Sequence, residues 1–180
     1  MRRAVNFVRR HPAGLIFLLL TVYLMYRIFC FSAEVSAVSD KTSEGVCYFI
    51  ASLFIHGFSS LPAEQQEAQI LEMVPIVRKI AHFAIYGALG FSSMLTLCSF
   101  FLECKRRLRL WRVGMWAAGF SLFYAITDEV HQLFVEGRSG SVRDVLIDFS
   151  GASLGVVFAA VIMALVIKYA KPTKKHRKYF

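Results

Sequence analysis

Four long runs of apolar residues limit the folds that this chain can adopt. A helix rises about 1.5 Å per residue, so about 20 apolar residues in succession cross the roughly 30 Å hydrocarbon core of a bilayer. The runs cover about residues 14–31, 76–101, 111–133 and 142–168. With 57% hydrophobic and only 18% charged residues, the chain of 180 residues lacks the polar surface of a soluble globule. The sequence therefore predicts an all-α membrane protein, one integral domain formed by a bundle of four transmembrane helices.

The residues before the first two runs indicate where these spans begin. Four arginines precede residues 14–31, an arrangement that a cleavable signal peptide shares. The run is longer than the core of about 7–15 residues found in signal peptides, so we expect an uncleaved first span. Pro75 directly precedes the second run, and proline is favoured in the first turn of a helix. The second span is therefore expected to begin just after Pro75.

The distribution of charge predicts the side of the membrane that each connection faces. With four spans, the segments before the first, between the second and third, and after the fourth, together with the span ends beside them, hold 15 basic residues and one acid, Glu103. The opposite connections, together with the span ends beside them, hold 5 basic residues and 11 acids. Because short cytoplasmic segments carry the excess of lysine and arginine, we expect both termini in the cytoplasm, with a basic tail at residues 169–180.

The connection at residues 32–74 is the longest part outside the predicted spans, and it is expected on the outer side. Within it, residues 45–59 are apolar but too short to span, with Ser52, His56 and Ser59 on one stripe. Such a segment is typical of an amphipathic helix lying on the membrane or packed against the bundle. A fifth span here would place the basic segment 105–112 outside, so we predict a short amphipathic helix on the outer face and leave open whether it is interfacial or re-entrant.

Two features of composition exclude other classes of protein. The net charge of +9 arises from basic residues at the ends of apolar runs, which indicates membrane topology and not nucleic-acid binding. The four cysteines form no CxxC pair and have no metal-ligand spacing. They are expected to be buried apolar side chains, although Cys30 and Cys47 could meet on the outer side.

Polar residues on the second and third runs gather near the predicted outer side, where a charge inside lipid is costly and usually functional. On the second run, Arg78, His82, Tyr86 and Gly90 recur every four residues and so share one helix face. The end of the third run carries a second polar face with flanking residues, namely Tyr124, Asp128, Glu129, His131 and Gln132. Gly137 is then expected to end the helix, and Arg138 opens the next connection.

The fourth run begins with two acidic residues one turn apart. Ser141 and Asp144 have the spacing of a variant capping box, and Asp144 would also complement the helix dipole. Asp148 lies too deep to be explained as a cap. It is aligned with Gly151 and Gly155, small residues that allow another helix to approach closely.

This outer cluster has two interpretations. Its four acids and four bases balance, so charged pairs could simply join three helices (Asp128, Glu129, Asp144 and Asp148; Arg78, Lys79, Arg138 and Arg143). The functional interpretation is a hollow open to the outside and lined by these side chains. We favour a site, because joining helices alone seldom needs so many costly groups in one place.

Three chemistries would suit such a site. Acid–base catalysis would use a histidine and neighbouring carboxylates, with His82, Asp128, Glu129, Asp144 and Asp148 as catalytic candidates. Binding of an anion would use guanidinium groups, with Arg78, Tyr86, Gln132 and Arg138 as binding candidates. Metal binding by His82 and the aspartates would be a third chemistry, but no spacing specifies it, so no metal ligand and no cofactor are predicted.

Two blocks of residues resemble the VanZ-like family. The first runs from Arg78-Lys79-Ile80-Ala81-His82-Phe83 to Tyr86 and Gly90. The second runs from Thr127-Asp128-Glu129 through Gln132, Phe134, Gly137, Arg138, Ser141, Asp144 and Asp148 to Gly151 and Gly155. The serine-rich segment 31–39 is also similar, and the likeness covers about residues 15–165. The chain departs from the family pattern at Asp148, where asparagine is common, and at Ile85, where a glutamate often precedes the tyrosine.

The resemblance implies a multi-pass protein of the bacterial plasma membrane, associated with the cell envelope and with low-level resistance to the glycopeptide teicoplanin. It names no reaction. We expect a pocket in the outer leaflet that binds an anionic cell-wall or lipid-linked component. The expected partners are membrane lipids, a lipid-linked cell-wall precursor or glycopeptide, and a second copy of the chain. Two alternatives stay open: a membrane-embedded hydrolase or transferase acting on envelope precursors by acid–base or metal chemistry, and a structural membrane subunit.

Overall fold

The computed structural model describes residues 12–34, 36–102 and 110–169, and this part of the chain is helical without strands. Its elements are α2 (Pro12–Ala33), α3 (Ser36–Phe54), the short 3₁₀ helix η1 (Phe58–Ser60), α4 (Ala63–Leu102), α5 (Leu110–Gln132) and α6 (Val142–Tyr169). The all-α prediction is confirmed. The arginines before the first run, the basic residues 105–109 and the basic tail from residue 170 onward lie outside the described residues.

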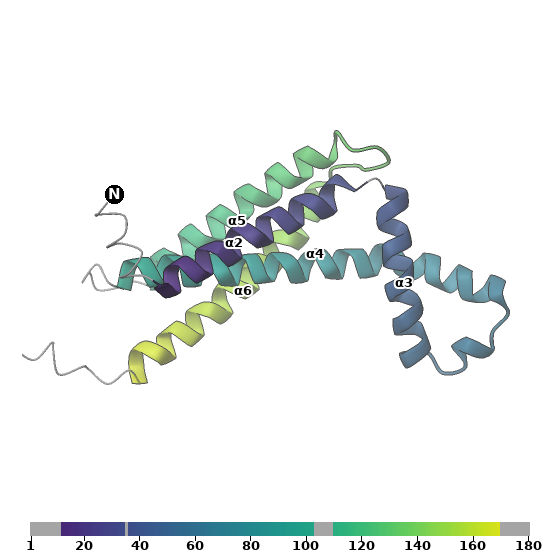
Figure 1. Ribbon diagram of the computed structural model, residues 1–180, viewed down its shortest axis with the longest axis horizontal. Helices are drawn as coiled ribbons and strands as arrows, with labels where there is room; N and C mark the ends of the chain where they lie inside the picture. The colour runs from purple at the N-terminus through teal and green to yellow at the C-terminus, as the bar shows by residue number, and fades with distance from the viewer. Residues whose placement is uncertain (1–11, 35, 103–109, 170–180) are drawn as a thin grey trace, which may run out of the picture.

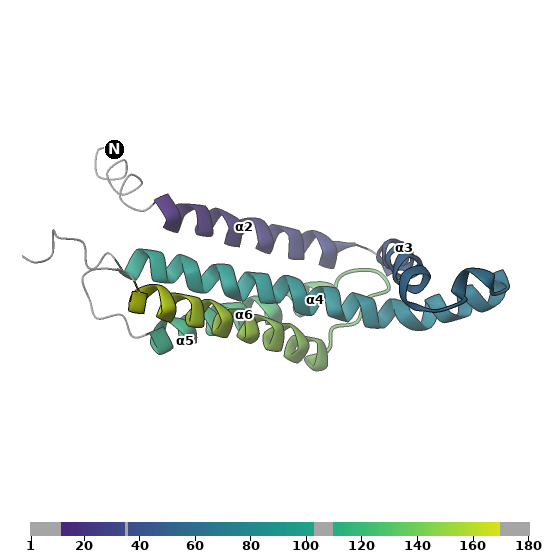
Figure 2. The same cartoon turned by 90° about the horizontal axis from the view of Figure 1, so that it is seen from below.

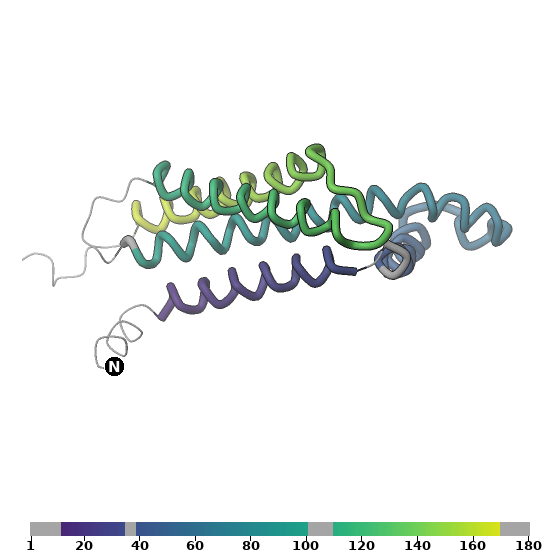
Figure 3. The backbone as a smooth tube through the Cα atoms, turned by 90° about the horizontal axis from the view of Figure 1, so that it is seen from above, coloured from purple at the N-terminus to yellow at the C-terminus, as the bar shows by residue number. Residues whose placement is uncertain are grey.

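Helices α2, α4, α5 and α6 run lengthwise beside one another, and α3 crosses them steeply at one end (Figure 1). Helix α4 lies between α2 on one side and the pair α5 and α6 on the other (Figures 2 and 3). The first residues of α2 and the last residues of α6 lie at the same end of the bundle. The opposite end holds α3 and the connection between α5 and α6, where the predicted polar cluster lies.

Three of the described helices are long and apolar enough to cross a membrane: α2, α4 over Ala63–Phe100, and α6. Large apolar side chains on their surfaces are more than half exposed, including Leu19, Leu154 and Phe158. A surface of this kind is suited to lipid, which supports a membrane protein. Helix α5, the expected third span, is not among the three, because its sequence is more polar and ends in Asp128 and Glu129. The four-span topology and the cytoplasmic termini stay predictions.

The structure changes the expectation for residues 45–59. The helix is α3, which begins at Ser36 and ends at Phe54, so His56 and Ser59 do not share its face with Ser52. Gly57 then adopts a left-handed conformation with φ of 76°, and η1 follows. Buried Cys47 and Ala51 of α3 pack against Ile70 and Val74 of α4. Helix α3 thus packs on α4 through Cys47 and Ala51, which are not part of the predicted stripe of Ser52, His56 and Ser59. Cys30 and Cys47 are both free thiols.

The expectation that a helix begins after Pro75 is wrong, because Pro75 lies inside the continuous helix α4. Proline removes one backbone hydrogen bond and usually kinks or ends a helix. Here the apolar cluster with α3 includes Ile70 and Val74 before the proline and Val77 after it. Packing on both sides of Pro75 therefore holds the polar segment at 63–73 and the apolar run in one helix.

Helices α4 and α6 meet backbone to backbone, as the glycine strip on the fourth run predicted. A Cβ atom on Gly155 would collide with the carbonyl oxygen of Gly87, and one on Gly151 with that of Phe83. Gly90 on α4 faces the backbone of Ala152 in the same way. The absence of side chains at these positions therefore sets how closely the two helices approach.

Replacing Gly155 with alanine should destabilise the bundle, because the new methyl group must push α6 away from α4. Overpacking of this kind typically costs about 1–3 kcal/mol. Gly119→Ala on α5 is the matched control, since a Cβ there meets no other atom within 4 Å and alanine favours the helix. Thermal unfolding of the purified protein in detergent should give a lower Tm for Gly155→Ala and an unchanged or higher Tm for Gly119→Ala. Equal melting of the two variants would contradict the close contact.

Candidate functional site

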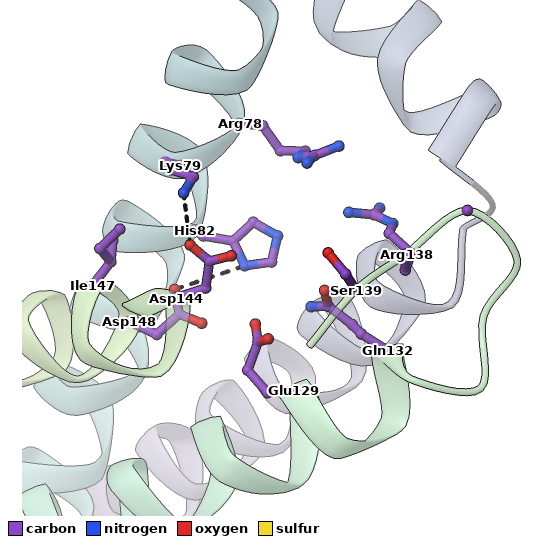
Figure 4. A pocket seen from close by; sticks show the side chains of 11 residues that line it. Arg78, Lys79, His82, Glu129, Gln132, Arg138, Ser139, Asp144, Ile147 and Asp148 are labelled. Atoms are coloured by element: carbon purple, nitrogen blue, oxygen red, sulfur yellow. Dashed lines mark hydrogen bonds and ion pairs between the residues drawn. The ribbon is translucent and has the colours of Figure 1, made fainter. Parts of the chain in front are cut away.

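A polar hollow of about 90 Å³ lies where α4, α5, α6 and the connection between α5 and α6 meet (Figure 4). Most of the residues that line it are polar, and the full set is Arg78, Lys79, His82, Glu129, Gln132, Gly137, Arg138, Ser139, Asp144, Ile147 and Asp148. The structure thus brings side chains from three helices into one place, as the position of the polar cluster predicted.

Acidic groups and the imidazole lie deep in this region. Nδ1 of His82 on α4 lies 3.8 Å from Oδ1 of Asp148 on α6. One ligand atom each from His82, Asp128 and Asp148 lies within 4.8 Å of the other two. Asp128 is 4% exposed and Asp148 is 1% exposed, so both carboxyl groups are shielded from solvent.

Asp128 is held by side chains from two helices. Ser32 at the end of α2 donates a hydrogen bond of 2.8 Å from its Oγ to Oδ2 of Asp128. Gln132, one turn further along α5, donates to the same oxygen at 3.5 Å and to the Ser32 hydroxyl at 3.3 Å. Tyr124 also ties α5 to α2, since its hydroxyl donates to the carbonyl of Met25 at 2.6 Å. The end of α2 is therefore part of the site.

The beginning of α6 is capped differently from the prediction. Ser141 accepts a hydrogen bond of 3.2 Å from the backbone N–H of Arg143. The other half of a capping box would have Asp144 accept from the backbone N–H of Ser141, but that N–H donates to Oε2 of Glu129 at 2.8 Å. Asp144 instead forms an ion pair of 2.8 Å with Nζ of Lys79 on α4. Glu129 takes over the capping role because α5 and α6 lie side by side here.

Two arginines face one another at the rim of the hollow (Figure 4). Arg78 on α4 forms an ion pair of 3.1 Å with Asp40 on α3. Arg138 donates to the backbone carbonyls of Phe31 and Glu34 at the end of α2, both at 3.2 Å. Burial, and then the charge of Arg78, lower the pKa of the Arg138 guanidinium, although the group remains cationic. Within the described ranges, Arg138 has no carboxylate at ion-pair distance.

Seven of the nine predicted site residues line the hollow, and two lie beneath it. Asp128 is in contact with Ser32 and is too deep to line the hollow. Tyr86 is fully buried, packed against Ile28 and Leu89, and its hydroxyl has no hydrogen-bond partner among the described residues. Tyr86 therefore belongs to the interior below the hollow, and not to its walls. The catalytic and binding roles of all nine residues stay predictions.

Sequence reasoning missed two residues that complete the site. Ser32 was part of the serine-rich segment 31–39, but only the structure shows that it contacts Asp128. Asp40 follows the same segment and pairs with Arg78. Ser32 could have been recognised as a candidate from the sequence, because it is a polar residue directly after the apolar run 14–31. Nothing in the sequence indicated that Asp40 pairs with Arg78, because this pairing depends on α3 crossing α4.

A family model described as VanZ/LLP1 matches residues 17–164 of the chain. This chain belongs to the VanZ/LLP1 family. No curated protein and no solved structure matches it significantly. The matched range contains every residue of the hollow and of the deeper cluster. The site is therefore built within the VanZ/LLP1 part of the chain.

Replacing Ser32 with alanine should destabilise this VanZ/LLP1 protein, because the buried carboxyl group of Asp128 would lose its shortest hydrogen bond. Leaving a buried polar group unsatisfied costs about 1–3 kcal/mol. Ser52→Ala is the matched control, since Ser52 is exposed and its hydroxyl donates only to the carbonyl of Phe49 in its own helix. Thermal unfolding should show a lower Tm for Ser32→Ala and little change for Ser52→Ala. A Ser32→Ala protein that melts with the wild type would show that the contact contributes nothing.

Proposed function

We propose that this protein binds the anionic head group of a lipid-linked cell-envelope component in the polar hollow, at the outer side of the bacterial plasma membrane. The observation that carries the proposal is the pair of arginines at the rim, Arg78 and Arg138. Two guanidinium groups that face one another repel, and an anion between them would relieve this repulsion. Guanidinium groups also match phosphate and carboxylate oxygens in a two-pronged geometry.

Arg138 is the better placed of the two arginines to take up a ligand. A guanidinium group has five N–H donors, and Arg138 gives two of them to the carbonyls of Phe31 and Glu34. These two bonds fix the side chain without neutralising its charge. The remaining donors can reach an anion in the hollow, whereas Arg78 is already partly neutralised by Asp40.

A second cavity next to the hollow supports a lipid as the source of the head group. It has a volume of about 260 Å³ and lies between α2, α3 and α4. Most of its walls are apolar, with Ile28, Phe31, Val46, Val77, Ala81 and Ile85 among them, and it shares Arg78 and His82 with the polar hollow. An amphiphile could place its charged group between the arginines and the first part of its chain against these apolar side chains.

The deeper groups would then act on the bound head group. His82 lies between the two cavities and lines both, so its imidazole can donate to, or exchange a proton with, an anion held by the arginines. Glu129 and Asp144 are already engaged by Ser141 and Lys79, which keeps their charges from repelling the ligand at full strength. Such binding would limit the access of a glycopeptide such as teicoplanin to envelope precursors in resistant cells.

A lipid phosphate provides a direct test of head-group binding. Purified full-length protein in detergent, studied by native mass spectrometry, should bind a polyprenyl phosphate at least tenfold more tightly than the corresponding polyprenol. Arg138→Gln should lower the affinity for the polyprenyl phosphate about tenfold, which is the equilibrium equivalent of about 1.4 kcal/mol.

Arg143→Gln is the matched control for this experiment. Arg143 lies in the first turn of α6, is exposed and does not line the hollow, so its loss should leave phosphate binding unchanged. Equal affinity for the phosphate and the alcohol would contradict the proposal. So would equal losses in the Arg138 and Arg143 variants, because that result would indicate only a general attraction between charges.

The effect in cells can be measured as susceptibility to teicoplanin. Expression of the protein in a susceptible Gram-positive host should raise the lowest inhibitory concentration of teicoplanin. Alanine at His82, Asp128 or Arg138 should abolish this increase while an immunoblot shows a normal amount of protein in the membrane. Full resistance in all three variants would leave only a structural role for the cluster.

A further inference from the structure

We infer that His82, Asp128 and Asp148 form a binding site for a divalent metal ion, of the kind that accepts both imidazole and carboxylate ligands, such as Zn²⁺ or Mn²⁺. The three residues come from three different helices, α4, α5 and α6, so no spacing along the sequence could have identified them as a set. Metal binding goes beyond the proposed function, because it needs neither the arginines nor a lipid.

The geometry of the three side chains is close to that of a metal site. One ligand atom from each residue lies within 4.8 Å of the other two, and Nδ1 of His82 is 3.8 Å from Oδ1 of Asp148. Nitrogen and oxygen ligands bind Zn²⁺ at about 2.0–2.2 Å, so two ligands at the tetrahedral angle lie about 3.3–3.6 Å apart. A contraction of about 1 Å, within the reach of side-chain rotation, would bring all three around one ion.

A buried atom without a partner gives a second and independent indication of a ligand. Oδ2 of Asp148 is buried and has no hydrogen-bond partner in the described part of the chain. The hydroxyl of Tyr86, one turn below His82 on α4, is buried as well and has Asp128 as its near neighbour. Buried polar atoms are nearly always satisfied, so the unpartnered oxygen of Asp148 indicates a group that it can contact.

The balance of charge favours a cation as that group. Asp128 and Asp148 are both more than nine-tenths buried and lie within 4.8 Å of one another. No lysine or arginine within the described ranges forms an ion pair with either of them; Lys79 pairs with Asp144 and Arg78 with Asp40. Two carboxylates in a dry site need compensation, and His82 alone can supply at most one positive charge. A divalent ion neutralises both.

The surrounding residues have the arrangement expected around metal ligands. Ligands in metal sites are usually oriented by further hydrogen bonds, which are worth about 10–100-fold in affinity. Ser32 and Gln132 both donate to Oδ2 of Asp128 and so fix the orientation of this carboxylate. Three protein ligands leave one coordination position of a tetrahedral ion open. Since His82 and Asp148 line the polar hollow, this position would face it.

The test uses the full-length protein without a polyhistidine tag, stripped with EDTA and then titrated with Zn²⁺ or Mn²⁺ alone. Elemental mass spectrometry after removal of free metal should give one equivalent per chain, and bound Mn²⁺ should give an altered electron paramagnetic resonance spectrum. Asp148→Asn and, independently, His82→Gln should weaken binding at least tenfold. Asp144→Asn, the same substitution one turn earlier on α6, should keep the full equivalent, because Asp144 pairs with Lys79 and lies outside the triad.

Wild-type protein that holds no metal after stripping and titration would overturn the inference and would indicate a proton shared between the two aspartates instead. Equal binding by the wild type, Asp148→Asn and His82→Gln would also overturn it, since the metal would then bind elsewhere on the chain. Arg138→Gln should retain the metal. The two proposals are therefore tested separately. A failure to bind polyprenyl phosphate would not contradict the metal site, and a failure to bind metal would not contradict anion binding by the arginines.

Discussion

The contact between the backbones of α4 and α6 is the constraint on which the rest of this structure depends. Gly151 and Gly155 have no side chains, so α6 can rest directly on the carbonyl groups of α4. This contact lies just below the site, with Gly151 less than one turn beyond Asp148. It brings Asp148 within 3.8 Å of His82 and Asp144 within 2.8 Å of Lys79. With bulkier residues at these glycines, the imidazole and the carboxylates would be separated, and neither the hollow nor the deeper cluster would form.

A second feature of the molecule is that polar groups are arranged by depth. Arginines lie at the rim, the Lys79–Asp144 pair and Glu129 lie in the walls, and Asp128 and Asp148 lie at the bottom with almost no exposure. Each level suits a different kind of chemistry: capture of an anion, support of the helix ends, and binding of a cation or proton. Membership of the VanZ/LLP1 family fits this arrangement, because the matched range 17–164 contains all three levels.

The sequence alone predicted those features that depend on the periodicity of one helix. The apolar runs located the main helices, the four-residue spacing placed Arg78 and His82 on one face, and the glycine strip indicated a close helix contact. Features that depend on contacts between distant segments could not be obtained in this way. Ser32 and Asp128 are 96 residues apart, and nothing local to either residue specifies the other. Pro75 was mistaken for a helix start because the preference of proline for the first turn takes no account of tertiary packing. In the structure, α3 packs against residues of α4 both before and after Pro75.

The two bonds from Arg138 to the carbonyls of Phe31 and Glu34 have a consequence for the α2–α3 region. One side chain thereby holds the end of α2 and also reaches into the hollow. An anion that draws the guanidinium group further into the hollow would lengthen these two hydrogen bonds. Helix α3 follows α2 directly, and its Asp40 pairs with Arg78. A shift at the end of α2 would therefore also affect the position of Arg78. An anion bound by Arg138 would therefore share this guanidinium group with the carbonyls that hold the end of α2.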